Sequence, residues 1–441
     1  MLDQRKMVWK PAFVLFWVAL IVGGPFQALA APMRGDAVQE DKKETPLADP
    51  DASPPLPVRL TPWMTLGAKL RWELLRRENR DLQGTIEDDR TESEPALKIA
   101  GLITPRTNVE LFAQAALTDR TRYRDGGETT RNTTVEIERA YLLWRSALGA
   151  PLDVQLGRQR FHDPREWLFD ENLDAVRLLF DYGAWGADLS VSSTPSTDDR
   201  ADRMRNGMAS ISYQRRPHER AALYALLRRD ISLNDWDPTW LGVSLHRRTG
   251  THQYWLEAAA LSGRDGARTL RSHGVDLGYR LRLPSTFKPS FMVGYARGSG
   301  DENPADTIDQ VFQQTGLQDN EAKLNGITTI KYYGEVFDPE LSNLEVWTAG
   351  AGVTILKGWR LEGVWHRYDE VVADDRLRDA GIRRRPSGNE RSLGGEVDLV
   401  LGIQAIPHAR IEVTGGVFAP GRAFPGADAA YLGKIEFQFV L

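Results

Sequence analysis

The chain of 441 residues contains no cysteine. This excludes a disulfide framework, a thiolate metal site and a cysteine nucleophile. The seven histidines are scattered without metal-ligand spacing, and neither a G-x-S-x-G elbow nor a P-loop occurs. We therefore expect no metal, no cofactor and no enzymatic activity.

One catalytic alternative stays open at two adjacent residues, Ser272 and His273. A lipase-like barrel enzyme would need a serine and a histidine together on the lipid-facing rim. Nucleophilic catalysis requires those two side chains to lie within hydrogen-bond reach. Their relative position in the fold therefore tests this alternative.

The first 30 residues have the three parts of a secretory signal peptide. Arg5, Lys6 and Lys10 form a basic region, residues 11–22 are apolar, and Ala28-Leu-Ala30 is a small-x-small cleavage site. We expect cleavage near Ala30. Residues 31–57 are rich in Pro, Asp, Glu and Lys and are expected to form a disordered periplasmic leader. Residues 58–441 are expected to form one domain.

Long apolar runs are missing from that domain. A membrane-spanning helix needs about 20 apolar residues, and no segment after the signal peptide provides them. The hydrophobic fraction is nevertheless 41%, with 13 tryptophans. The formal charge is −5, and loss of the signal peptide, with three bases and one acid, leaves about −7. Nucleic acid is therefore not an expected partner.

The dominant pattern is strict alternation of apolar and polar residues. At the C-terminus Ile435, Phe437, Phe439 and Leu441 alternate with Lys434, Glu436 and Gln438. Period two is the period of a strand, whose side chains point to opposite faces in turn. Residues 66–74, 275–282 and 396–403 repeat the pattern. A soluble sandwich would expose the polar face to bulk water, whereas a membrane barrel uses it to line a wet lumen.

Segment length favours the membrane barrel. The alternating segments span mostly ten to thirteen residues, close to the about 9–11 that a membrane strand needs. Counting from Trp63 predicts an all-β, antiparallel transmembrane barrel of about eighteen strands, with sixteen as the nearest alternative. The last strand should seal against the segment at Leu66–Leu74. Tryptophans near segment ends, including Trp72, Trp240, Trp255 and Trp365, predict aromatic girdles.

Long polar stretches alternate with short connections, as outer loops alternate with periplasmic turns in such barrels. The longest stretch, residues 298–342, is too long for a plain connection and is expected to hold a gate.

Arginines occur at many positions that the alternation places inside. Inward faces are predicted to carry Arg71, Arg280, Arg282, Arg360 and Arg410, and residues 136–181 contain Arg139, Arg158, Arg160 and Arg177 together with several acids. Arginine keeps its charge and matches carboxylates with a planar fork. Such a lining would favour anions. The alternative is that arginine–carboxylate pairs only brace the barrel interior.

Four long motifs resemble those of the bacterial alginate export porins. They are Leu156-Gly-Arg-Gln-Arg160 followed by Trp167 and Asp170-Glu-Asn172, Tyr295-Ala-Arg-Gly-Ser-Gly300, residues 312–320, and residues 333–344. Weaker matches are residues 275–278, 396–400 and 415–421. They run in order from about residue 135 to 425.

The resemblance implies an eighteen-stranded outer-membrane barrel that exports the acidic polysaccharide alginate through an arginine-rich constriction, gated by an outer loop and a periplasmic turn. The positions that match the family motifs are Arg139, Arg158, Arg160, Asp170, Arg297, Glu335 and Glu340. We expect these, with Arg71, Arg177 and Arg280, to line the substrate path, and Arg139, Arg158 and Arg160 to share one constriction.

The chain departs from the family at Asp338, Glu412 and Thr414, where members can carry basic residues. This leaves open whether the substrate is alginate itself or a similar polyuronate. The alternative function is an anion-selective uptake porin for small organic acids or oligosaccharides. Expected partners are an anionic polysaccharide, outer-membrane lipid and, as a class, periplasmic polysaccharide-secretion proteins.

Overall fold

The computed structural model describes residues 53–84, 89–125, 127–194, 204–216, 218–230, 235–324 and 327–441, without the side chains of 322–324. The predicted signal peptide and most of the predicted leader lie outside these ranges. No helix in the described part of the chain is long and apolar enough to cross a membrane.

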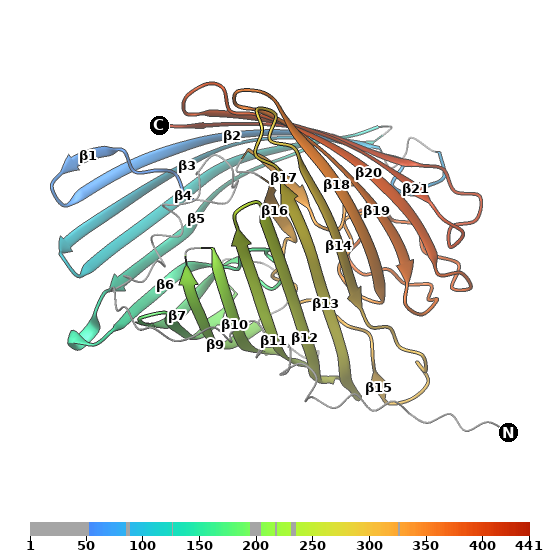
Figure 1. Cartoon of the computed structure of the whole chain (residues 1–441), viewed down its shortest axis with the longest axis horizontal. Coiled ribbons are helices and arrows are strands. Elements are labelled where there is room, and N and C mark those ends of the chain that lie inside the picture. Colours follow the sequence, from blue (N-terminus) through green and yellow to red (C-terminus); the bar gives the residue numbers. More distant parts are fainter. Residues whose placement is uncertain are drawn as a thin grey trace.

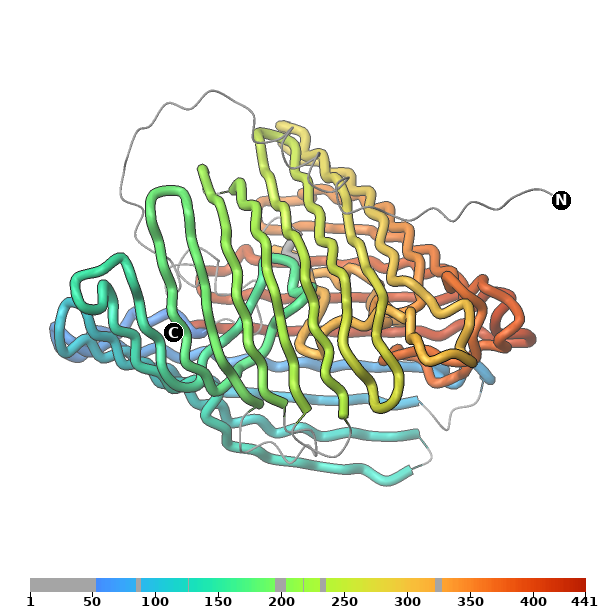
Figure 2. The backbone as a smooth tube through the Cα atoms, turned by 90° about the horizontal axis from the view of Figure 1, so that it is seen from below, coloured from blue at the N-terminus to red at the C-terminus, as the bar shows by residue number. Residues whose placement is uncertain are grey.

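Eighteen antiparallel strands of the described chain form one closed β-barrel (Figure 1). This confirms the predicted fold class and the count of eighteen. In Figure 2 the green and yellow strands cross in front of the blue and red strands, which form the opposite wall. The wall strands are β2 (Met64–Glu78), β3 (Arg90–Arg106), β4 (Val109–Arg124), β5 (Thr130–Trp144), β6 (Leu152–His162), β7 (Asp170–Tyr182), β8 (Trp185–Ser193), β9 (Met204–Arg216), β10 (Glu219–Asp230), β11 (Trp236–Thr249), β12 (His252–Asp265), β13 (Arg268–Arg282), β14 (Ser290–Gly298), β18 (Leu344–Leu356), β19 (Trp359–Glu370), β20 (Ser392–Ile403), β21 (Ala409–Pro420) and β22 (Ala430–Val440).

The barrel closes where β22 pairs with β2, as predicted. Leu70 lies opposite Phe439 and Leu74 opposite Ile435. Glu436 points inward and accepts a hydrogen bond from Arg71 Nε at 2.7 Å. Ile435 is 47% exposed on the outer face. The alternation along the last strand therefore separates a lumenal face from a lipid-facing one.

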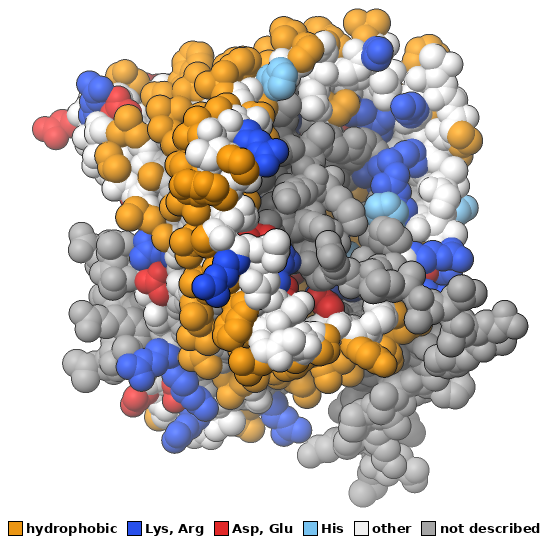
Figure 3. Space-filling view, turned by 90° about the vertical axis from the view of Figure 1, so that its left-hand side faces the viewer, with side chains coloured by type: hydrophobic (Ala, Val, Ile, Leu, Met, Phe, Trp, Pro, Cys, Tyr) orange, Lys and Arg blue, Asp and Glu red, His pale blue; other side chains and the backbone are white. Residues whose placement is uncertain are grey.

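The outer surface is apolar in the way that a membrane barrel requires. Hydrophobic side chains cover a broad, connected area of the face drawn in Figure 3. Trp72 and Trp365 lie on the outer surface, in agreement with the girdle prediction. For Trp240 and Trp255 that prediction is wrong, because both are buried inside. Their indole N–H groups donate to Gln313 O and Asp276 Oδ1.

Most connections at one end of the barrel, called the turn end, are shorter than those at the other, the loop end, although only two residues join β12 to β13 there. Two loop-end connections fold back into the lumen. The short inner loop is residues 163–169, and the long inner loop is residues 299–343, with β15 (Ile308–Asp309), β16 (Glu321–Leu324) and β17 (Thr328–Lys331). β1 (Val58–Thr61) pairs with the turn end of β2.

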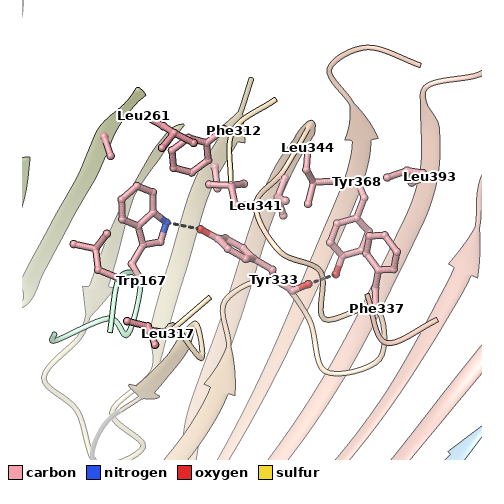
Figure 4. Packing of buried hydrophobic residues seen from close by; sticks show 14 of the residues in the cluster. Trp167, Leu261, Phe312, Leu317, Tyr333, Phe337, Leu341, Leu344, Tyr368 and Leu393 are labelled. Carbon is pink, nitrogen blue, oxygen red and sulfur yellow. Dashed lines mark hydrogen bonds between the residues drawn. The ribbon is translucent and has the colours of Figure 1, made fainter. Parts of the chain in front are cut away.

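The two inner loops pack into an apolar core inside the barrel (Figure 4). Trp167 of the short loop donates its indole N–H to Tyr333 Oη of the long loop at 3.0 Å. Tyr368 of β19 donates its hydroxyl to the Tyr333 carbonyl at 2.9 Å. Phe337 stacks on Phe418 of β21 with ring centroids 4.9 Å apart. The loops are therefore fixed both to each other and to the wall.

Wall carboxylates fix the backbone of the long inner loop. Glu396 of β20 accepts hydrogen bonds from the N–H groups of Val336 at 2.7 Å and Phe337 at 2.8 Å. Glu412 accepts one from Thr329 N–H at 2.8 Å. Buried N–H groups need such partners, since an unpaired one destabilises the fold. The long inner loop therefore occupies part of the lumen in one defined conformation.

Replacing Gly334 by Ala should loosen this loop. Gly334 has φ +96°, and a Cβ there would clash with Tyr368 Oη and Glu396 Oε1. Strain of this kind costs about 1–3 kcal/mol. We expect a larger open-channel current in planar bilayers if the loop is the gate.

Gly433→Ala is the matched control, because a Cβ at Gly433 meets nothing within 4 Å. An unchanged current in folded Gly334→Ala protein would contradict the gating prediction.

Candidate functional site

Two adjoining cavities lie beside the inner loops, with volumes of about 660 Å³ and about 290 Å³. They share Glu171, Asn172, Gly316 and Leu317 in their linings. The larger one has the size of a small-ligand site. Together they are the candidate substrate path beside the long inner loop.

The larger cavity lies next to a break in the wall. The described strands β5 and β6 pair only from Ala140–Arg158 to Trp144–Val154, although β5 extends to Thr130. On the loop-end side of this ladder, Glu136, Ile137 and Glu138 line the cavity. Arg158 of β6 spans the break and donates through Nη1 to the Ile137 carbonyl at 2.9 Å. Its Nε also donates to Asp174 at 2.8 Å.

The three arginines expected to share a constriction lie beside β7, Arg139 and Arg160 next to Asn172 and Arg158 next to Asp174. Arg139 donates through Nε to Asn172 Oδ1 at 3.0 Å. Arg160 lies opposite Asn172 in the β6–β7 register and lines the smaller cavity, whereas Arg158 lines the larger one. Asp170 accepts from Arg160 Nε at 2.5 Å and also lines the smaller cavity.

Other predicted path arginines lie on the inner wall away from the two cavities. Arg71 contacts Glu73, Glu94 and Glu436. Arg177 pairs with Asp188 at 2.5 Å, and Arg280 lies 3.6 Å from Glu362.

Arg360 and Arg410 are also buried on this wall beside acids. Fixed pairs of this kind are the bracing arrangement that the sequence left open.

The three remaining predicted residues are Arg297, Glu335 and Glu340. Arg297 is exposed and shares the outer face of β14 with Phe291 and Val293, so we leave it out of the proposed path. Glu335 belongs to the long inner loop and lies 3.3 Å from Lys434 Nζ. Glu340 lines the larger cavity and accepts from Gln314 N–H at 2.6 Å.

Several lining residues were not singled out from the sequence. They come from β10, β11, β12 and the connection after β19, and are Arg228, Asp230, Trp236, Asp265 and Arg378. Arg228 is buried beneath the Trp236 ring and donates to Asn206 Oδ1 at 3.0 Å and to the Thr315 carbonyl. Alternation along β10 indicates that Arg228 faces inward, but not that a loop residue lies against it.

The larger cavity is not simply basic. Its described lining contains six carboxylates and three arginines. Arg158 is paired with the carboxylate of Asp174, and Arg228 donates to the neutral acceptors Asn206 Oδ1 and the Thr315 carbonyl. Burial raises the pKa of Glu340 to about 7, against the lowering effect of Arg378. The protonation of Glu340 therefore changes the charge of the cavity near neutral pH.

One acidic group also contains a histidine. Ligand atoms of His162, Glu166 and Asp170 lie within 4.8 Å of one another, and such a set could hold a metal ion. The sequence did not point to these three residues as a metal site, because they are brought together only when the short inner loop folds. Arg160 lies 2.5 Å from Asp170 and 3.7 Å from Glu166 and supplies a positive charge there.

Ser272 and His273 do not form a catalytic pair. Ser272 is buried on the inner face of β13, and His273 is exposed on the outer face. Consecutive strand residues point to opposite sides of the wall.

Comparisons with known proteins agree with this architecture. A family model described as "Alginate export" matches residues 62–437. The chain is 28% identical over 374 residues to the alginate production protein AlgE of Pseudomonas aeruginosa, covering 69% of this chain and 75% of that protein. It is 32% identical over 135 residues to AlgE of Azotobacter vinelandii, covering 29% and 27%.

Among solved structures, Pseudomonas aeruginosa OpdQ has a TM-score of 0.57 at 10% identity, covering 86% of this chain and 98% of OpdQ. Pseudomonas aeruginosa OpdK has a TM-score of 0.56 at 12% identity, with the same coverage. These two show a shared fold. The match over residues 62–437 shows more: the chain belongs to the alginate export family and is a β-barrel of the outer membrane.

Proposed function

We propose that this barrel passively secretes an anionic exopolysaccharide, alginate or a similar polyuronate, past lumenal arginines. The observation that carries the proposal is that Arg158 lines the larger cavity and Arg160 the smaller one, with Arg139 bonded to Asn172, which lines both, in a barrel of the alginate export family. Arginine binds carboxylates through a planar fork.

In this mechanism the polymer's carboxylates exchange with the protein's own. Arg158 is held by Asp174 and Arg160 by Asp170 in the resting barrel. A uronate that displaces either acid meets an arginine of fixed position. The displaced acid stays nearby and competes with the uronate for the arginine, which shortens the time for which the polymer is bound. A conduit must release what it binds.

Transport in this proposal involves no covalent step, and the chain acts as a transporter without catalysis. The polymer is handed over by periplasmic polysaccharide-secretion proteins. We also propose that residues 1–30 are removed near Ala30 and that residues 31–57 remain as a periplasmic leader.

Planar-bilayer recordings of the purified barrel test the function. We expect a reversal potential that indicates anion preference and a current that polyuronate blocks. Block by small organic acids without block by polyuronate would instead favour the uptake porin. Cation preference together with insensitivity to polyuronate would refute both.

Replacing Arg160 by Glu should reduce anion preference. The change places a third acid beside Glu166 and Asp170 and removes the cation that lies against them. The measurement is the reversal potential in a salt gradient. Arg131→Glu is the matched control, because Arg131 lies on the outer face of β5, where it pairs with Asp119 of β4. Equal reversal potentials in Arg160→Glu and the unchanged protein would contradict a role for Arg160 in selectivity.

Anion preference should also depend on pH. Because the pKa of Glu340 is raised to about 7, its carboxyl is mostly neutral at pH 6 and mostly charged at pH 8. The larger cavity is then less negative at pH 6, and we expect stronger anion preference there. Glu340→Gln should show the pH 6 preference at both pH values. If the pH dependence persists unchanged in Glu340→Gln, a group other than Glu340 causes it.

A further inference from the structure

An unusual group of basic residues lies on the outer face of the barrel, at the loop end of β12, β13 and β14. Arg264, Arg271, His273 and Arg297 are all exposed there. Arg264 lies opposite Thr269, two residues from Arg271, and Arg297 lies opposite Val275, two residues from His273. Diagonal neighbours on one face of a sheet are within reach of long side chains. The four form one basic patch.

The arginines of this patch differ from other arginines on the outer face. Arg131 pairs with Asp119, Arg229 with Asp237 and Arg367 with Asp369. Within the described chain, no acid lies within ion-pair distance of Arg264, Arg271 or Arg297.

The acids nearest to the patch are already engaged. Asp237, opposite Arg264, pairs with Arg229 at 3.2 Å. Glu345, opposite Arg297, accepts from Tyr295 Oη at 3.3 Å and from Trp347 Nε1 at 3.2 Å. Glu345 keeps its negative charge, because both of its donors are neutral. The three arginines outweigh this one acid, so the patch has a net positive charge.

The patch borders the lipid-facing part of the wall. Going toward the turn end from His273 and Arg297, the outer face continues with Leu277 on β13 and with Val293 and Phe291 on β14, which are 43%, 55% and 52% exposed. Such a band meets the hydrocarbon, and charged residues above it lie at headgroup height. Long outer loops mark the loop end as extracellular, so these headgroups belong to the outer leaflet.

We propose that the basic patch binds the phosphate groups of a phosphorylated glycolipid of the outer leaflet, of the lipid A class. A guanidinium that is not held by a carboxylate can donate two parallel hydrogen bonds to a phosphate, and arginine is the residue best suited to this geometry. The acyl chains of the same lipid would lie along the apolar residues below. The inner face of these strands carries the core that fixes the two inner loops. Lipid bound to the outer face would therefore also stabilise the part of the wall against which these loops pack.

The test compares lipid A retention by the purified barrel in native mass spectrometry. We expect Arg271→Glu/Arg297→Glu to bind lipid A at least about tenfold more weakly than the unchanged protein, since it loses two charge-assisted contacts. Arg271→Lys/Arg297→Lys should keep most of the binding. Arg247→Glu is the matched control, because Arg247 is exposed at the turn end of β11. Heat-modifiable migration on gels confirms that each variant is folded.

Two comparisons separate lipid from free phosphate. Dephosphorylated lipid A should bind to the unchanged protein as weakly as lipid A binds to the double glutamate variant. Inorganic phosphate at millimolar concentration should not displace lipid A from the unchanged protein. Equal retention of lipid A by the double glutamate variant and Arg247→Glu would overturn the proposal. So would equal binding of the phosphorylated and dephosphorylated lipids.

Discussion

The structure depends on one constraint: in a membrane, backbone N–H and C=O groups find no water and must pair with each other. The two edge strands of an open sheet would leave N–H and C=O groups unpaired, so the sheet must close into a barrel. Here the closure is the ladder between β22 and β2, which joins the C-terminal strand to the first wall strand. Inward and outward faces are defined only after this closure, and with them the polar lumen and the apolar exterior. The β5–β6 ladder is short, and that is where the larger cavity lies.

The lumen is filled to a large extent by the chain's own inner loops. Their backbone is subject to the same constraint, and wall carboxylates such as Glu396 and Glu412 serve as acceptors. This explains why acids occur on the inner wall at positions such as Glu412, where related proteins can be basic. Acids on this wall bind backbone N–H groups or neutralise arginines. The lumen is therefore not uniformly positive, and the described lining of the larger cavity contains six carboxylates and three arginines.

This mixture of charges bears on the proposed transport of an anion. Most inner-wall arginines, such as Arg71 and Arg280, are held among acids and brace the wall. Arg158 and Arg160 are also paired, but they line the two cavities along which we propose that the polymer passes. In the proposed mechanism, selectivity depends on which ion pairs can exchange partners, and less on the total number of arginines.

The sequence by itself determined the strand period, the number of wall strands and the residues that seal the barrel, because period-two alternation is a local property of the extended chain. It also contained the motifs that group Arg139, Arg158 and Arg160. Only the tertiary structure decided that Trp240 and Trp255 face the lumen and that Arg297 faces outward. The cavity lining by Arg228, Trp236 and Arg378 was decided in the same way. The physical reason is that these positions depend on how two loops fold back into the barrel and on where one ladder ends, and both are set by contacts between residues far apart in the chain.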